Sequence, residues 1–217
     1  MQEELRRIYS ARFSGLEAYR DQVWRVLTSQ FFSKWIKPSH AVLDLGCGYC
    51  EFINNINARD RFAMDLNPVA KDHVSAGVRV IEQDCSAPWP LGDDTLDVVF
   101  SSNFFEHLPT KAALQATLLE AYRCLRPGGR IIALGPNIRY LTGRYWDFFD
   151  HQLCLSEMSV SEALLMAGYR VEQAIPRFLP YTMSQGLRPP VWSVSLYLKA
   201  RFAWRFIGRQ FLVIARK

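Results

Sequence analysis

The chain has 217 residues, of which 49% are hydrophobic and 22% charged, so it suits one sizeable globular domain and excludes a disordered protein. Its net charge of +5 is unevenly distributed: residues 1–172 carry 18 basic and 21 acidic side chains, whereas residues 173–217 carry eight basic and no acidic ones. This distribution excludes a uniformly basic nucleic-acid binder and leaves a basic C-terminal tail to be explained.

Short apolar runs, typical of buried strands, alternate with patterns of helical period. The predicted helices are residues 1–37, 52–56, 111–125, 156–167 and 190–207. The predicted strands are residues 41–45, 61–66, 78–82, 96–101, 130–134, 170–175 and 210–215. This alternation predicts an α/β fold built from βαβ units, with a mostly parallel sheet covered by helices on both faces. We expect a single domain, 1–217, without internal repeats.

Nothing in the sequence resembles a secretory signal, and no run of about 18 uncharged apolar residues is present, so we expect no spanning helix. The five cysteines are an odd number in a chain without a signal, which argues against a disulfide framework. We therefore expect a cytoplasmic protein.

A glycine loop follows the first predicted strand. Gly46 and Gly48 stand between that strand and a helix, where a backbone without Cβ atoms can turn sharply and approach a ligand. In an open α/β sheet this first crossover is where nucleotide-like ligands bind. Asp44, just before the glycines, is placed to pair with a ligand ammonium.

Two further acids end the next two strands. Asp65 ends the second strand and suits hydrogen bonds from ribose hydroxyls, whereas Asp84 follows the third strand and suits an amino group at an adenine edge. Three carboxylates around one crevice favour a ligand with a cationic head and an adenosine over a pyrophosphate. Each of them alone has a second interpretation, as a capping or turn-forming Asp.

The sequence resembles the class I S-adenosylmethionine-dependent methyltransferases of the type 11/12 kind. The matching segments are Asp44-Leu-Gly-Cys-Gly48, Asp65, Asp84-Cys85, Leu96 to Leu108, and Leu125-Arg-Pro-Gly-Gly-Arg130. The resemblance implies a Rossmann-like seven-stranded sheet whose last strand, 210–215, is antiparallel. It implies a helical extension or lid at 1–37, a cofactor-binding half at 38–135 and an acceptor-side half at 136–217.

The same resemblance implies S-adenosylmethionine as cofactor and a role for each matching residue. Gly46, Cys47 and Gly48 would surround its methionine part, Asp65 with Leu66 its ribose, and Asp84 with Cys85 its adenine, while Asn103 and Phe104 would line the sulfonium end. The family usually has a third glycine where this chain has Cys50. Cysteine is small, so we expect cofactor binding to survive this departure.

Cys47 and Cys50 also form a C-x-x-C between a strand and a helix, the setting of a thiol redox pair. That alternative explains neither Asp65 nor Asp84. A zinc site would need two more ligands at matching spacing, and the other cysteines form no second pair, so no metal is expected.

Two histidines are candidates for work on the methyl acceptor. His107 follows the fourth strand, and His151 lies in an aromatic insertion, residues 145–151, after the fifth strand. For a hydroxyl acceptor a base must remove a proton, so both are candidate catalytic residues. Tyr145, Trp146 and His151 are candidate substrate-binding residues, because loops over a site carry specificity. The alternatives are a helix-start histidine at 107 and an aromatic lid core at 145–149.

The basic tail has two interpretations. Between residues 190 and 207 an apolar stripe runs along one helical face, with Arg201, Arg205 and Arg209 on another. The segment is either a packed helix with solvated arginines or a basic amphipathic helix, with 188–209 in peripheral contact with the inner membrane face or a lipid-linked acceptor. The region from Pro176 onward resembles methyltransferases encoded with bacterial polysaccharide assembly.

These observations predict O-methylation of a small-molecule or glycan-type acceptor. The alternatives are methylation of a lipid-like or quinone acceptor and a cofactor-binding module without turnover. The acidic body argues against a nucleic-acid partner.

Overall fold

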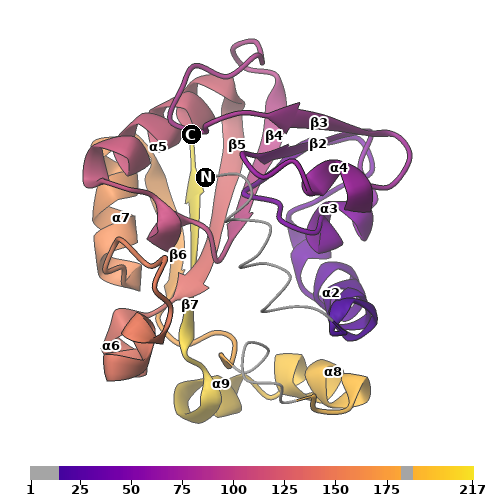
Figure 1. Cartoon of the computed structure of the whole chain (residues 1–217), viewed down its shortest axis with the longest axis vertical. Coiled ribbons are helices and arrows are strands. Elements are labelled where there is room, and N and C mark those ends of the chain that lie inside the picture. The colour runs from indigo at the N-terminus through magenta and orange to yellow at the C-terminus, as the bar shows by residue number, and fades with distance from the viewer. Residues whose placement is uncertain (1–14, 182–187) are drawn as a thin grey trace.

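A computed structural model of the chain describes residues 15–181 and 188–217. Within these residues a single seven-stranded sheet has the order β3-β2-β1-β4-β5-β7-β6 (Figure 1). The strands are β1 Ala41–Leu45, β2 Asp60–Asp65, β3 Val78–Glu82, β4 Leu96–Ser102, β5 Leu125–Pro136, β6 Arg170–Ile175 and β7 Gln210–Arg216. β7 is antiparallel to both of its neighbours and every other neighbouring pair is parallel, which confirms the predicted fold class.

Helices cover both faces of this sheet. They are α2 Glu17–Gln30, α3 Glu51–Asn54, α4 Ala70–His73, α5 Lys111–Cys124, α6 Ile138–Leu141, α7 Glu157–Met166, α8 Val191–Lys199 and α9 Arg201–Ile207. Short 3₁₀ turns lie at Phe32–Lys34, Phe105–His107 and Thr142–Asp147. Figure 1 shows α5 and α7 on one side of the sheet and α2 and α3 on the other, with α6, α8 and α9 at the end where β5 stops and β7 begins.

Each face of the sheet has its own apolar core. Leu118 of α5 and Leu164 of α7 pack on one face against strand residues such as Val99. On the other face the core is aromatic, and Phe52 stacks on Phe100 with ring centroids 3.6 Å apart. Because β1 is covered on both faces, all five of its residues are buried, which explains its uninterrupted apolar run.

Two helices begin where their sequences provide caps. The Thr110 hydroxyl accepts a hydrogen bond from the N–H of Ala113 at the start of α5. Ser156 and Ser159 form a reciprocal capping box at the start of α7. These side chains satisfy backbone donors that have no partner inside the helix, so both helices start within a residue of the predicted positions.

β5 is longer than predicted. Pro127, Gly128 and Gly129 indicate a break, yet the strand begins at Leu125, which pairs with Leu96. A register shift between Leu96 and Val98 accommodates the irregular segment, as β-bulges do. The prediction of a strand starting at residue 130 was therefore too short.

The prediction of one continuous helix over 190–207 was wrong. The chain breaks at Ala200 (φ −84°, ψ 65°) into α8 and α9. The break lets Trp204 enter the aromatic core, where it contacts Phe31 and Phe178 and donates an indole hydrogen bond to the carbonyl of Tyr197. No helix in the described part of the chain has the length and apolar character to cross a bilayer.

Candidate functional site

The glycine loop lies between β1 and α3, as predicted. Gly46 has φ +70° and Gly48 has φ +51°, both in the region that favours glycine. A Cβ at Gly46 would lie 2.1 Å from Cγ of Phe104, so the loop and the end of β4 approach as closely as glycine permits. The candidate residues Gly46 and Phe104 are thus brought together.

Cys50 occupies the position that glycine usually holds in the related family. Its φ is +61°, so the chain keeps the left-handed backbone there without the residue that adopts it most easily. Its buried thiol lies 3.7 Å from the Cys47 sulfur and 3.6 Å from the Ala70 carbonyl. These contacts fix the thiol in the core behind the loop.

The thiol pair has the environment of inert rather than redox-active cysteines. Cys47 and Cys50 are both buried and free. The Cys50 thiol beside it and burial raise the pKa of Cys47 well above its ordinary value. Reactive cysteines are exposed and have lowered pKa values, so the geometry does not favour the redox alternative.

Asp44 is buried on β1 directly before the loop. Burial, and then the nearby carboxylates of Glu51 and Asp65, raise its pKa well above the ordinary range, although a hydrogen bond from the Ile53 backbone opposes the shift. A buried carboxylate among other acids is stabilised by a cation placed beside it. Asp44 therefore suits the predicted role of holding a ligand ammonium.

The sequence analysis missed an ion pair beneath the same loop. Arg20 of α2 forms an ion pair with Glu51 at the start of α3, and both side chains are largely buried. Because an isolated buried carboxylate is costly, the arginine offsets the acid nearest Asp44. The only sequence signal for Arg20 was its position in the predicted N-terminal helix, and this position does not indicate that Glu51 is its partner.

Asp65, at the end of β2, is tied to two loops. Its Oδ2 accepts from the Gly48 N–H and its Oδ1 from the Asn67 N–H, both at 2.8 Å. Burial raises its pKa despite these hydrogen bonds. The carboxylate thus connects the glycine loop to the turn that begins at Leu66, where a ribose-binding acid is expected.

Asp84 and Cys85 follow β3 and differ in their surroundings. Asp84 is exposed and accepts hydrogen bonds from the Ser86 N–H and hydroxyl, both at 2.8 Å, as in a turn-forming Asp. Cys85 is buried, its sulfur lies 3.4 Å from the Thr117 hydroxyl, and burial raises its pKa to about 11. At this position only Asp84 presents a side chain toward solvent.

Asn103 and Phe104 end β4 beside the glycine loop. Asn103 has φ +50°, and its N–H donates to the Leu134 carbonyl at 2.8 Å. Its Nδ2 donates to the Ser102 hydroxyl, whereas its buried Oδ1 accepts no hydrogen bond from the described residues. Such an acceptor is costly unless a donor reaches it, so this atom points to a ligand that supplies one.

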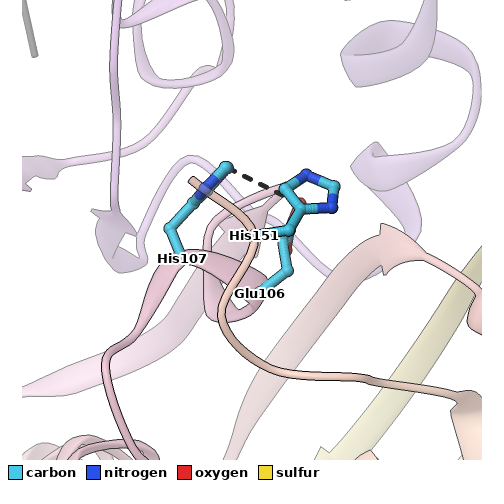
Figure 2. A group of neighbouring side chains, drawn as sticks. All are labelled: Glu106, His107 and His151. Carbon is cyan, nitrogen blue, oxygen red and sulfur yellow. Dashed lines mark ion pairs between the residues drawn. The ribbon is translucent and has the colours of Figure 1, made fainter. Parts of the chain in front are cut away.

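The two candidate histidines meet although they are 44 positions apart in the sequence. Figure 2 shows His107 and the preceding Glu106 on the turn after β4, with His151 beside them. The ring centroids of the histidines are 5.0 Å apart. His107 Nδ1 lies 3.1 Å from the Asp150 carbonyl and 3.3 Å from its Oδ2, and Nε2 lies 3.9 Å from Glu106 Oε1.

Glu106 is a second residue that the sequence analysis missed. It is buried, and its backbone carbonyl accepts from the N–H groups of Gln152 and Leu153. These bonds attach the insertion after β5 to the turn after β4, which places His151 beside His107. The only sequence signal for Glu106 was its position directly before the candidate residue His107.

The aromatic insertion does not present all its rings to solvent. Tyr145 is fully buried, and its hydroxyl donates to the Leu153 carbonyl, so its ring supports His151 from inside at 4.8 Å. Trp146 is half exposed and Phe149 is 98% exposed. Of the three candidate substrate-binding residues, only Trp146 is exposed, whereas Tyr145 and His151 are buried.

Comparisons with known proteins agree with this architecture. The family described as a methyltransferase domain matches residues 43–133. An S-adenosylmethionine-dependent methyltransferase from Archaeoglobus fulgidus is 20% identical, with a TM-score of 0.68 over 91% of this chain and 94% of that one. A possible histamine N-methyltransferase from Thermotoga maritima is 17% identical, with a TM-score of 0.68 over 99% and 97%.

Residues 43–133 match the methyltransferase-domain family, and the fold is similar to that of S-adenosylmethionine-dependent methyltransferases. The matched residues contain the end of β1, the glycine loop and Asp65, and they support the methyltransferase class and the cofactor, S-adenosylmethionine, that the sequence predicts. A putative methyltransferase from Haloferax volcanii, solved with the activator Trm112, is 16% identical, with a TM-score of 0.66 over 95% of this chain and 93% of that one. A search of curated proteins finds no match.

The residues around the glycine loop fit this cofactor. Asp44 offers a buried carboxylate for a cationic group, and Asn103 offers a buried oxygen that accepts no bond from the described residues. Residues 1–14, which include the rest of the predicted N-terminal lid, lie outside the described part of the chain.

Proposed function

We propose that the protein transfers the methyl group of S-adenosylmethionine to an oxygen of a small-molecule or glycan-type acceptor. The observation that carries this proposal is the cluster of Glu106, His107 and His151, whose ligand atoms lie within 4.8 Å of one another at the turn that follows Asn103 and Phe104. A hydroxyl acceptor must lose a proton during transfer, and an imidazole beside the cofactor crevice can take it.

The cofactor supplies an electrophilic methyl carbon, and the chain positions it. In this proposal Asp44 holds the ammonium, Gly46, Cys47 and Gly48 surround the methionine part, and Asn103 and Phe104 line the methionine and sulfonium end. Asp65 with Leu66 binds the ribose, and Asp84 with the Cys85 backbone binds the adenine. The support is their common position at the carboxyl ends of β1 to β4, where ligands bind in open α/β sheets.

His107 is the proposed proton acceptor. Its side chain is 25% exposed, whereas His151 is buried, so an acceptor hydroxyl reaches His107 more easily. Asp150 lies beside Nδ1, which favours the tautomer that leaves Nε2 to accept a proton. The buried carboxylate of Glu106 then stabilises the imidazolium, while His151 and Trp146 border the acceptor.

A metal ion at this cluster is a weaker alternative. Zinc binds nitrogen and oxygen ligands at about 2.0–2.2 Å, so two ligand atoms on one ion lie at most about 4.4 Å apart. The present spread of up to 4.8 Å would have to contract around an ion. We therefore assign the cluster to proton transfer.

Titration calorimetry with S-adenosylmethionine tests the cofactor, and a methyl-labelled cofactor incubated with cell-envelope glycan extracts tests transfer. We expect binding and a labelled product. Labelled lipid or quinone instead of glycan would select the alternative acceptor, and binding without any product would indicate a non-catalytic module. Failure of the folded protein to bind the cofactor would refute the proposal.

His107→Gln provides the residue-level test. We expect transfer to fall by about 10²–10⁴-fold, the usual contribution of a positioned base, with unchanged affinity for the cofactor. His40→Gln is the matched control, because His40 directly precedes β1, at the opposite end of that strand from the glycine loop, and accepts a hydrogen bond from the Lys37 N–H. Equal transfer rates in both variants would show that His107 removes no proton.

The tail carries the proposed partner contact. Four basic side chains of the tail are exposed: Arg188, Lys199, Arg201 and Arg205. The large apolar side chains of Trp192 on α8 and Phe202 on α9 are exposed as well. This combination supports peripheral contact of 188–209 with an anionic membrane surface, at the inner face for a cytoplasmic protein, as the polysaccharide-assembly resemblance suggests. Cosedimentation with phosphatidylglycerol vesicles, compared with phosphatidylcholine vesicles, tests it; equal binding to both would refute it.

A further inference from the structure

A cavity that includes no residue of the glycine loop lies between α2 and the pair α8–α9. Its volume is about 390 Å³, within the ~300–1,000 Å³ range of small-ligand sites. Its walls are aliphatic and aromatic: α2 contributes Val23 and Leu27, α8 contributes Val194, and α9 contributes Ala203. Large apolar space of this kind suits a hydrocarbon group.

The polar atoms that border the cavity are satisfied, with one exception. Tyr19 donates to the Pro189 carbonyl and Tyr197 to the Phe178 carbonyl. Gln210 is buried at the first residue of β7, and its Nε2 donates to the Pro180 carbonyl at 2.8 Å. Its Oε1 is buried and accepts no hydrogen bond from the described residues.

A buried amide oxygen in an apolar cavity is costly unless a donor reaches it. The cavity is therefore complementary to a hydrocarbon that carries a hydroxyl or an N–H group. A bound water could supply the same donor, but a single water leaves most of the apolar wall without contacts. The geometry points to an organic ligand.

The cavity opens toward the exposed side of the tail helices. Leu196 and Ile207, which line it, are 59% and 51% exposed. Lys199, Arg201 and Arg205 lie on the same two helices, and none of them has an ion-pair partner among the described residues. Lys199 and Arg201 border a different pocket, together with Lys34, and no charged side chain from residues 15–181 or 188–217 lines the cavity itself.

A chain of ring contacts connects this cavity to the histidine cluster. Pro180 lines the cavity, and the next residue, Tyr181, contacts Phe148 edge to face at 5.8 Å. Phe148 in turn stacks on His151 at 5.2 Å. The cavity and the histidine cluster are therefore linked through Tyr181 and Phe148.

We propose that this cavity binds the aliphatic chain of an amphiphilic methyl acceptor, with Gln210 Oε1 accepting a hydrogen bond from its hydroxyl or N–H group. The assignment of the ligand as the acceptor rests on the proposed function, but binding of the chain does not. The class of substrate is then a hydroxylated amphiphile, such as a glycan carried on a lipid, rather than a small polar molecule.

Calorimetric titration of the full chain with 1-hexanol, 1-octanol and 1-methoxyheptane tests the site. Two further methylenes should tighten binding about fifteenfold, from ~0.8 kcal/mol for each buried CH₂. The ether is an isomer of 1-octanol without a donor, so it should bind about two- to tenfold more weakly than 1-octanol if Gln210 accepts the hydroxyl proton. Equal affinities of alcohol and ether would overturn the role of Gln210.

Ala203→Trp should fill the cavity and weaken 1-octanol binding at least tenfold. The matched control is Ala112→Trp, at an exposed site on α5. Val194→Phe provides a second filling variant should Ala203→Trp lower the melting temperature. Unchanged 1-octanol affinity in the filled variants, or no 1-octanol binding at all, would overturn the proposal.

Parallel titration with S-adenosylmethionine separates the two hypotheses. A protein that binds the cofactor but not 1-octanol contradicts the lipid site alone. A folded protein that does not bind the cofactor contradicts the proposed function, whatever it does with 1-octanol. Equal cofactor affinity in Ala203→Trp and wild type would show that the cavity-filling change is local.

Discussion

Replacing Asp65 by Asn tests the link between the glycine loop and the cofactor. Both carboxylate oxygens of Asp65 accept backbone N–H bonds at 2.8 Å, one from Gly48 and one from Asn67. An amide has only one oxygen, so Asp65→Asn keeps one of these bonds and turns an NH₂ group toward the other donor. The loop loses an anchor, and the ribose loses a charged acceptor.

The expected effects on stability and on binding differ in size. Losing one hydrogen bond to a charged group costs about 1.5–3 kcal/mol, but burial already raises the pKa of Asp65, so removing its charge recovers part of that cost. We therefore expect the free energy of unfolding to fall by about 1 kcal/mol. Removing the charge brings no such gain for cofactor binding. The affinity for the cofactor should therefore fall by about 1.5–3 kcal/mol, roughly ten- to 150-fold.

Urea unfolding and calorimetric titration with S-adenosylmethionine measure the two effects. Asp60→Asn is the matched control, because Asp60 lies at the other end of the same strand and forms surface ion pairs with Arg59 and Arg79. We expect Asp60→Asn to leave cofactor affinity unchanged. Equal affinities in Asp65→Asn and Asp60→Asn would refute the ribose assignment.

Three further predictions concern the glycine loop and the residues around it. Because the pKa of Asp44 is raised and an ammonium favours its charged form, cofactor binding should release a proton. The affinity for the cofactor should therefore rise with pH and level off once Asp44 is ionised. Calorimetry at several pH values should show no such rise in Asp44→Asn. Gly46→Ala should lower the free energy of unfolding by about 2–5 kcal/mol in a urea titration, since a left-handed backbone costs an L-residue about 1–2 kcal/mol and its Cβ would overlap Phe104. Of the five thiols only Cys154 is exposed, so a thiol reagent should modify one cysteine rapidly in the folded protein, and two rapid reactions would contradict the burial of the loop pair.

The cofactor half could be predicted in detail because its signals are local. The apolar run at 41–45 suits a strand covered on both faces, and the glycines after it suit a turn between strand and helix. Asp65 could be placed from the end of its own strand. Neighbouring parallel strands end at the same edge of the sheet, so their order brings these residues together without long-range information.

The acceptor half could be predicted only in part because its geometry depends on distant contacts. Tyr145 was a candidate substrate-binding residue, but its hydroxyl reaches the Leu153 carbonyl and draws the ring inside. The break at Ala200 follows from the place that Trp204 finds between Phe31 and Phe178. No periodicity within 190–207 carries that information, because the residues that create it lie on other elements.

The acidic and basic residues of the chain are separated in the structure as they are in the sequence. Asp44, Glu51 and Asp65 gather beneath the glycine loop, and Arg20 neutralises only one of them, which leaves an excess of negative charge beside a cationic cofactor. Lys199, Arg201 and Arg205 of α8 and α9 are exposed instead, and the first two border a surface pocket with Lys34. Because buried charges are screened by salt far less than exposed ones, we expect cofactor binding at the glycine loop to change little with ionic strength, whereas binding of the exposed tail to an anionic surface should weaken as salt is added.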